Sequence, residues 1–597
     1  MSIQYGVYRT QLHEKTIEER DFLADSFEEW KCDYVGKANM ESVAFGCRVL
    51  RIYPESKDEQ QPLKCKEHPI LLTADCRLDN REELAHALGV TATDLLKTPD
   101  SSLILEAYLR WGRDCFQRLD GDFAIAIWDQ HSRQLLLARD VTGVRPLAYA
   151  TWDGGAAFSS SIPELYHLPS VPEALDDLKI AAIFGKHSTG RERTPFKSIK
   201  WVHPGAVITI CDSNISKEIF ATIKPMTLSP EERRNPAPRL GELLKESVRK
   251  RIRGQGDLVC ELSGGFDSGS ITALVAKLLE KSSRNVSAIS WTPDYDTVPP
   301  LKGPDERNEI QWIEQHYSIH CSYVSPCLNK NASNTLFESS FRQNAASAIG
   351  NARTVLSGSG GDECASFYLR GFHPHALLAD GIGPAIHRLL ADFQEMPFGY
   401  QAPLRLIRGI KGMLKARIRN QQFKSDKSSI INSQLKDKWR QALAQAHGDG
   451  IMRDILPSGA HDCMTRAFAR GHLEQRAATE SLDAAHIGVS MAYPMQDAQL
   501  LSFMISLPSH YFNYSSRRRQ LFRRALDSLT IKLAPNTRKQ EEALATRSQK
   551  RQSPSYSKPA QDEMKSLQSR FFKSTPNLMR HQIDHLYGII EHSVKKN

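Results

Sequence analysis

The first third of the chain has the hydrophobic pattern of short strands. Apolar runs over residues 68–80 and 120–140 are broken by turn residues and predict paired strands. Residues 81–89 and 101–112 instead carry apolar side chains at helical spacing, and Gly89 ends the first of these helices. The pattern therefore predicts strands with two helical segments up to about residue 210.

The pattern changes after a polar, proline-containing stretch at residues 221–238. Beyond it, helical segments alternate with short apolar strands such as 257–263 and 285–291, an order typical of a parallel sheet with helices on both faces. Residues 365–530 then predict mainly helix.

A chain of 597 residues is too long for one core. We expect an α+β domain at 1–210, a linker at 211–238 and an α/β domain at 239–597.

Composition narrows the class of protein. Hydrophobic residues make up 40% of the chain and charged residues 25%, as in ordinary globular proteins. No run of about 18 apolar residues and no signal-peptide pattern is present, so we expect a cytoplasmic protein without a membrane segment. The eleven cysteines form no C-x-x-C pair, which argues against a zinc site or a disulfide framework.

The net charge of +9 is concentrated in residues 405–427 and 515–524. The first stretch has apolar residues at helical spacing, so it is either a helix with one solvated face or a docking surface for an acidic peptide or partner. Nucleic acid is not expected, because neither a recognition motif nor interleaved aromatic residues accompany the charge.

Candidate chemistry begins at "ELSGGFDSGS", residues 261–270, where a predicted strand turns into a helix. Backbone N–H groups of Gly264 and Gly265 at a helix N-terminus can bind phosphate, and the hydroxyls of Ser263 and Ser268 can donate further hydrogen bonds. Asp267 can hold magnesium. The simpler alternative is a tight turn with an Asp or Ser cap.

A second glycine-rich turn, "TVLSGSGGDECASF" at residues 354–367, follows another predicted strand. Asp362 and Glu363 can cap a helix, but in a doubly wound sheet both turns lie at the carboxyl edge of the strands, where ligands bind. Asp267 and Asp362 are therefore predicted to share magnesium across one triphosphate.

Residues 263–268, "SGGFDS", resemble the pyrophosphate loop SGGxDS of ATP pyrophosphatases, which adenylate a carboxylate. Across most of its length the chain resembles the asparagine synthetase superfamily. In its first half the resemblance rests on "RWGRDCFQRLDGDFAIAIWD", "LLLARDVTGVRPLAY", "AFSSSIPEL" and "IKWVHPGAVITI", and in its second half on "SGGFDS", "SGSGGDE", "AYPMQDAQL" and "APNTRKQ".

The resemblance implies the fold class α/β. It implies an Ntn-type glutamine amidotransferase-like αββα sandwich over 1–210, followed at 239–597 by a doubly wound, parallel-sheet ATP-pyrophosphatase domain with a helical C-terminal part. ATP and Mg²⁺ are the implied cofactors.

The first half of the chain differs from that family at the position of the catalytic nucleophile. Glutamine hydrolysis there needs a cysteine at position 2, where this chain has Ser2, and the nearest cysteine in the sequence is Cys32. The family's glutamine-binding Asn-Gly-Glu is replaced by Ala74, Asp75 and Cys76. We therefore expect an inactive glutaminase domain retained for architecture.

Without ammonia from glutamine, the amine must come from elsewhere. Lasso-peptide cyclases join a peptide's N-terminal amine to an Asp or Glu side chain, and the missing cysteine makes the chain most similar to them. Ser359 in place of the family's Glu, and "AYPMQD" (492–497) in place of "RVPFLD", fit a reshaped carboxylate site. The alternatives are a small-molecule ligase, either a β-lactam synthetase or an ammonia-dependent asparagine synthetase, and an inactive scaffold.

Further residues are candidates for the chemistry. Lys539 is the candidate cation for the reaction, with Arg538 as a second candidate, and the alternative is a surface lysine in a basic segment. Glu480 or Glu474 is the candidate base, and the alternative for each is a solvated helix residue. The implied partners are a precursor peptide and a leader-peptidase or leader-binding protein. Adenine is expected to lie against two strand ends and the second loop: Leu262, Ile289, Ser290, Ser357 and Gly358.

Overall fold

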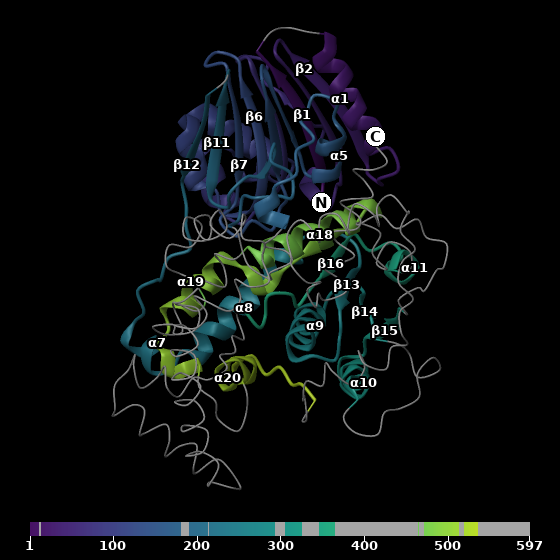
Figure 1. Cartoon of the computed structure of the whole chain (residues 1–597). Helices are drawn as coiled ribbons and strands as arrows, with labels where there is room; N and C mark the ends of the chain where they lie inside the picture. The colour runs from purple at the N-terminus through teal and green to yellow at the C-terminus, as the bar shows by residue number, and fades with distance from the viewer. Residues whose placement is uncertain are drawn as a thin grey trace, which may run out of the picture.

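The computed structural model describes residues 1–10, 14–180, 190–212, 214–292, 305–324, 345–364, 464, 471–512 and 519–534. Two six-stranded antiparallel sheets form its N-terminal part (Figure 1). The first sheet has the order β10 (Ile199–Trp201), β8 (Ala148–Trp152), β9 (Gly155–Ser159), β1 (Ile3–Arg9), β3 (Val43–Val49) and β2 (Tyr34–Met40). The second has the order β12 (Asn214–Ile219), β11 (Ala206–Cys211), β7 (Gln134–Arg139), β6 (Gly121–Asp129), β5 (Ile70–Leu78) and β4 (Leu63–Lys64).

The two sheets lie face to face, because one apolar cluster joins Tyr8 and Phe45 of the first to Leu71 and Trp128 of the second. Helices cover both outer faces. Against the first sheet pack α1 (Glu14–Ser26) and α5 (Ile162–His167), and against the second pack α2 (Arg81–Leu88) and α4 (Asp100–Trp111), with α3 (Ala92–Leu95) between them in the chain. Short 3₁₀ turns lie at η1 (Pro54–Ser56) and η2 (Gly112–Arg118).

The strands predicted at 68–80 and 120–140 and the helices predicted at 81–89 and 101–112 are confirmed. Gly89 ends α2 with a φ of 76°, a left-handed conformation that glycine adopts without steric strain.

The C-terminal part is built on a five-stranded parallel sheet, which confirms the mixed α/β class. The order is β15 (His320–Tyr323), β14 (Val286–Ser290), β13 (Leu258–Glu261), β16 (Thr354–Leu356) and β17 (Ser490–Ala492). Along the chain the strands run from β13 outward to β15 and then return to the other side of β13. The strand order therefore reverses between β13 and β16, where doubly wound sheets bind ligands.

Helices cover both faces of this sheet, because alternate strand residues enter different cores. Leu258 and Cys260 pack with α8 (Ala237–Arg251), α9 (Phe266–Leu279), α19 (Ala498–Ser506) and α20 (Gln520–Ser528). Val259 packs with α11 (Ala346–Ile349) and α18 (His472–His486) on the other face. The remaining elements are α7 (Pro230–Arg234), α10 (Glu306–Tyr317), η5 (Pro494–Gln496) and η6 (Ser509–Phe512).

Helix α18 belongs to both halves and runs along the boundary between them (Figure 1). Its Leu482 and Ala485 lie in the apolar core beneath the first sheet. The ring of its His486 lies 4.9 Å from that of Trp30, and the His486 carbonyl accepts a hydrogen bond of 3.1 Å from Lys31 N. The N-terminal part thus holds this helix directly.

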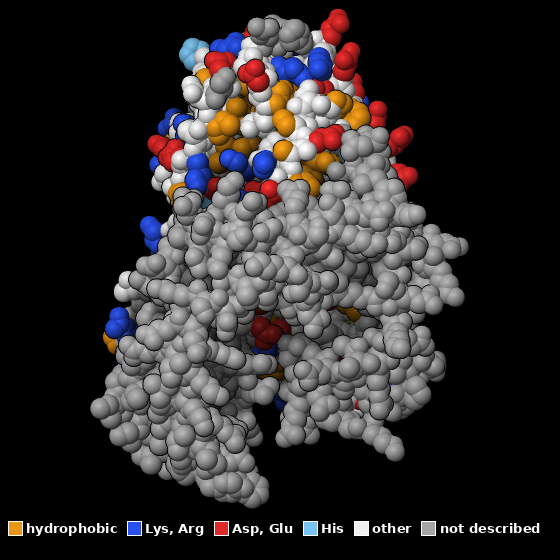
Figure 2. All heavy atoms as spheres, viewed as in Figure 1, with side chains coloured by type: hydrophobic (Ala, Val, Ile, Leu, Met, Phe, Trp, Pro, Cys, Tyr) orange, Lys and Arg blue, Asp and Glu red, His pale blue; other side chains and the backbone are white. Residues whose placement is uncertain are grey.

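Within the described ranges, none of the helices combines the length and apolar character needed to cross a bilayer. On the face seen in Figure 2, acidic, basic and apolar side chains of the N-terminal part lie among one another.

Candidate active site

The first glycine-rich loop connects β13 to α9, as predicted from the sequence. Gly264 has a φ of 73°, and a Cβ there would lie 2.3 Å from the carbonyl oxygen of Glu306, so only glycine fits. Gly265 caps α9, and the helix N-terminus therefore opens at this loop. The loop's hydroxyls bond within it: Ser268 Oγ lies 3.0 Å from Ser263 Oγ and accepts from Ser263 N at 3.1 Å.

The second loop follows β16 and touches the first. A Cβ on Gly358 would lie 2.6 Å from the backbone nitrogen of Ser268, and a Cβ on Gly361 would lie 2.2 Å from Cγ of Asp267. These two glycines therefore allow an approach that a larger residue would block. The predicted meeting of the two loops at one edge of the sheet is confirmed.

Asp267 and Asp362 meet at a third residue, Arg519. One guanidinium nitrogen of Arg519 lies 2.7 Å from Asp267 Oδ1, and the other donates to Asp362 Oδ1. The Arg519 side chain is 9% exposed, and its guanidinium carbon lies 5.7 Å from the centre of the Phe266 ring. The two carboxylates predicted to share a metal ion thus share a cationic group.

This arrangement fits a nucleotide with a divalent cation. Two carboxylates converge on one positive charge, and the glycines at 358 and 361 allow the second loop to lie directly against Asp267 and Ser268. The amides at the start of α9 are the groups that would hold phosphate.

Sequence reasoning missed Arg519, although the basic run 515–524 was a visible signal. From the sequence alone, this run is only one of two places where positive charge is concentrated. In the structure Arg519 reaches the loops, and Arg523 lies 4.4 Å over the Phe266 ring at the start of α9. At least these two basic residues belong to the candidate site.

Glu480, the predicted base, lies on α18 beside the carboxyl edge of β13. Its Oε1 accepts a hydrogen bond of 2.8 Å from Arg476 Nε. Glu261, the last residue of β13, accepts one of 3.2 Å from the indole N–H of Trp291. Burial, and then the negative charge of Glu480, raise the pKa of Glu261 to about 7. Sequence analysis did not single out Glu261, although an acid ending an apolar strand is a visible signal.

Glu474, the alternative base, lies elsewhere. Its carboxylate is buried and forms an ion pair with Arg191 of the N-terminal part. Its carboxylate therefore contacts the N-terminal part, whereas Glu480 acts on Glu261 at the edge of the parallel sheet, which makes Glu474 the weaker candidate.

The predicted adenine-binding residues lie together on neighbouring strands. Leu262 N donates to Ile289 O at 2.9 Å, and Ser357 N donates to Ala492 O at 2.9 Å. The side chains of Leu262, Ile289, Ser290 and Ser357 are buried in this structure. Lys539, Arg538 and the basic stretch 405–427 lie outside the described residues.

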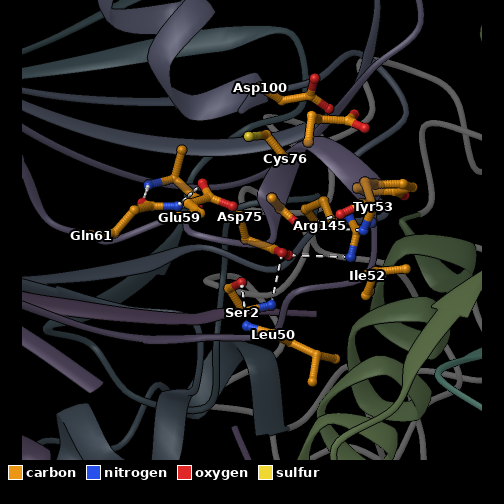
Figure 3. Close-up of a pocket in the computed structure, with 13 residues that line it drawn as sticks. Ser2, Leu50, Ile52, Tyr53, Glu59, Gln61, Asp75, Cys76, Asp100 and Arg145 are labelled. Atoms are coloured by element: carbon orange, nitrogen blue, oxygen red, sulfur yellow. Dashed lines mark hydrogen bonds and ion pairs between the residues drawn. The ribbon is translucent and has the colours of Figure 1, made fainter. Parts of the chain in front are cut away.

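A separate pocket in the N-terminal part contains Ser2 (Figure 3). Ser2 N donates to Asp75 Oδ1 at 2.9 Å, and Ser2 Oγ accepts from Leu50 N at 3.1 Å. Asp75 also pairs with Arg145 at 3.3 Å, and Arg145 lies 3.4 Å from Ser490 Oγ on β17. The Asp75 carboxylate in this pocket is thus held by the backbone of Ser2 and by Arg145.

Cys76 lines the same pocket as Ser2 (Figure 3). Burial, and then the negative charge of Asp100, raise the pKa of the Cys76 thiol well above its ordinary value. A thiol with a raised pKa stays protonated and is a poor nucleophile. Neither Ser2 nor Cys76 therefore has the surroundings of an activated nucleophile.

Comparison with known proteins agrees with this two-part architecture. Residues 3–221 match the glutamine amidotransferase domain family, and residues 239–325 match the asparagine synthase family. Asparagine synthetase [glutamine-hydrolyzing] 3 of Bacillus subtilis is 27% identical over 260 residues, which are 42% of this chain and 41% of that protein. A putative asparagine synthetase of Mycobacterium tuberculosis is 31% identical over 227 residues, 37% of this chain and 33% of that protein.

A more distant relative, amidase chyE of Penicillium rubens, is 23% identical over 256 residues, 42% of this chain and 37% of that protein. The chain spans less than half the length of each of these three relatives. The chain thus carries a region similar to the glutamine amidotransferase domain followed by a region similar to asparagine synthase, and its similarity is to asparagine synthetases.

Proposed function

We propose that the chain is an ATP-dependent, AMP-forming amide ligase that activates a carboxylate at the loops after β13 and β16. The amine it uses does not come from glutamine. Of the possible ligases we favour a lasso-peptide cyclase. Such an enzyme joins an Asp or Glu side chain of a precursor peptide to the N-terminal amine of the same peptide.

The convergence of Asp267 and Asp362 on the Arg519 guanidinium supports the ligase most strongly. Two acids on separate loops, held around one cation at the switch point of a parallel sheet, are what a nucleotide with its metal ion would need. ATP would supply the AMP group that activates the carboxylate, and Mg²⁺ would neutralise the charge of the pyrophosphate that leaves.

The chain's own groups have defined tasks in this proposal. The first amides of α9 and the hydroxyls of Ser263 and Ser268 would bind phosphate oxygens. Asp267 and Asp362 would hold the metal ion, and Arg519 would then be released to meet phosphate charge. Glu480, at the edge of the same sheet, would receive the proton of the attacking amine.

The N-terminal pocket supports an amine source other than glutamine. Its Ser2 hydroxyl accepts from a backbone amide, its one lining thiol has a raised pKa, and Asp75 is paired with Arg145. The N-terminal part still has a structural role, because it packs against α18, the helix that carries Glu480.

A small-molecule ligase of the same family is the second candidate, and the relatives named as asparagine synthetases favour it at least as well. In that form the substrate would be aspartate with free ammonia, or a small molecule that closes on its own amine. A precursor peptide and a leader-peptidase partner belong only to the first candidate.

ATP–pyrophosphate exchange tests the proposal. The full chain is incubated with ATP, Mg²⁺, labelled pyrophosphate and either aspartate or a linear peptide that has a free N-terminal amine and Asp or Glu side chains. Exchange with the peptide, and a product that has lost one water, would support the cyclase, whereas exchange with aspartate would support the small-molecule ligase.

Asp267→Asn is the matched negative control, because it keeps the shape of the loop and removes one of the two converging charges. Exchange that continued in this variant at the wild-type rate would contradict the proposed metal site. Genes for a short precursor peptide and a protease beside this one would favour the cyclase.

A further inference from the structure

The carboxyl edge of β13 carries a second carboxyl group besides Glu480. Glu261 ends a strand whose preceding residues, Leu258, Val259 and Cys260, are buried and apolar. The next residue, Leu262, begins the phosphate loop. A carboxyl group at this position therefore lies one residue from the loop that would bind ATP.

Glu261 is surrounded by groups from four elements. Trp291, just after β14, donates to its Oε1, and Ser357, just after β16, forms a hydrogen bond with its side chain. Glu480 and Arg476 face it from α18, while Tyr493, after β17, is buried near both acids and has its own pKa raised by burial and by the charge of Glu480.

The two acids face each other across the packing of β13 on α18. Val259, two residues before Glu261 and on the same face of β13, lies in one apolar core with Ala477 and Ala484 of α18, which flank Glu480 along the helix. The Oε2 atom of Glu480 is buried, and Glu480 also forms a hydrogen bond with the side chain of Tyr493. Neighbouring like charges do not ionise independently, so the charge of Glu480 keeps the proton on Glu261 to higher pH.

A partly buried carboxyl group is unfavourable at the end of an apolar strand. Transfer of a charged or polar group out of water is unfavourable unless it is paired, and an apolar residue would extend the pattern of β13 at no such cost. The stabilising contacts of Glu261 are two hydrogen bonds and one distant guanidinium. Packing alone therefore gives no reason for an acid here.

We propose that Glu261 and Glu480 act together as the proton acceptor for the amine in the ligation step. This inference rests on the proposed ligase function and adds a residue to it. The amine nitrogen forms a bond with the carbon of the adenylated carboxyl group, and the bond from that carbon to the AMP oxygen breaks. The electron pair leaves with AMP, and the proton of the nitrogen passes to the carboxyl pair.

Trp291 provides a test that needs no substrate, because its indole donates to Glu261. The fluorescence difference between the wild-type chain and Trp291→Phe is followed as a function of pH. We expect one transition near neutral pH. In Glu480→Gln it should move to lower pH, because the charge that raises the pKa of Glu261 is gone. An unchanged midpoint in that variant would overturn the pairing.

Glu261→Gln tests the role in the reaction. Pyrophosphate exchange reports activation alone and should stay within about threefold of wild type, whereas amide formation should fall about a hundredfold, the scale of a lost general base. The rise of the rate with pH near neutral, which the raised pKa of Glu261 sets, should be missing from the remaining rate. An equal loss of exchange and amide formation would overturn the proposal.

Two further variants guard against a purely structural effect. Glu261→Asp keeps the carboxyl group and should retain more amide formation than Glu261→Gln. Glu246→Gln, on the exposed face of α8, should leave both reactions unchanged. If the wild-type chain catalysed no exchange with any substrate, the proposed function would fail, while the Trp291 titration would still decide whether the acids are paired.

Discussion

Arg251 of α8 and Asp122 of β6 form an ion pair across the two halves of the chain. The distance between Arg251 Nη2 and Asp122 Oδ1 is 3.4 Å, and both side chains are buried, at 1% and 6% exposed. Arg251 also lies 3.0 Å from Asp497, and Asp122 lies 2.5 Å from Arg77. The halves are thus joined by a buried network of alternating charges.

This network predicts how stability depends on pH. Burial would raise the pKa of Asp122, but Arg77 and then Arg251 outweigh it and lower the pKa from 3.8 to about 2. The ionised carboxylate therefore stabilises the fold above its ordinary pKa, and this contribution is lost as pH falls through 3.8 towards 2. Urea unfolding of the full chain over this range should record the decline.

Arg251→Met should destabilise the chain at neutral pH by about 3 kcal/mol or more, because it leaves Asp122 and Asp497 with fewer buried partners. Removing this positive charge should also raise the pKa of Asp122 in the folded chain towards 3.8, so the decline in stability below this pH should become smaller. Arg249→Met, on the same helix but 74% exposed on its side chain, is the control and should change little. Equal effects of the two substitutions would contradict the network's role.

Arg519→Gln should weaken the fold in the absence of metal by roughly 1 to 3 kcal/mol, because two charge-assisted hydrogen bonds are lost. Asp267 and Asp362 would then face each other without a shared cation. Mg²⁺ alone should accordingly stabilise this variant more than it stabilises the wild type, as measured by thermal unfolding with and without the ion.

Adding Asp362→Asn to Arg519→Gln should abolish that extra stabilisation. Arg524→Gln, on an exposed position of α20, should behave as the wild type does. A magnesium response that is the same in all four chains would show that the two carboxylates do not form a cation site.

The N-terminal pocket should release no glutamate from glutamine. Ser2→Ala and Cys76→Ser should both leave the assay at background, since Asp75 is already bound to Arg145 and to Ser2 N, and the thiol has a raised pKa. A coupled glutamate assay with an active glutaminase as positive control is the measurement. A rate that either substitution abolished would restore the pocket as a glutaminase.

Lys539→Ala should lower amide formation about a hundredfold with little change in ATP affinity, because a cation over the α-phosphate meets charge that builds up mainly in the transition state. Lys539→Arg should recover little activity, since a planar guanidinium does not replace a compact ammonium. Single-turnover AMP release compares these with Arg538→Ala. Loss of activity only in the Arg538 variant would move the role to that neighbour.

The fold was largely predictable because its signals are local. Period-two and helical apolar patterns locate β5, β6, α2 and α4 to within a few residues. The meeting of the two glycine-rich loops was predictable as well, because the carboxyl ends of parallel strands share one edge of a sheet.

The partners at the site were not predictable in the same way. Arg519 lies 252 positions from Asp267 and 157 from Asp362, and no periodicity links a basic run to acids so far away. The partner of Glu261 was not predictable either. Its acidic side chain at the end of an apolar strand is visible in the sequence, but Glu480, the acid near it, is on α18. A sequence shows which charged side chains are present. Which of them come into contact depends on how distant helices and strands pack together.

Helix α18 makes the two halves inseparable as modules. One side of it contributes Leu482 and Ala485 to the N-terminal core, and the same helix carries Glu480 to the carboxyl edge of the parallel sheet. Such a chain can lose the catalytic activity of its N-terminal half but cannot lose the half itself, because α18 needs the N-terminal core to pack against. Exchanging N-terminal halves between relatives should therefore fail unless the helix is exchanged with them.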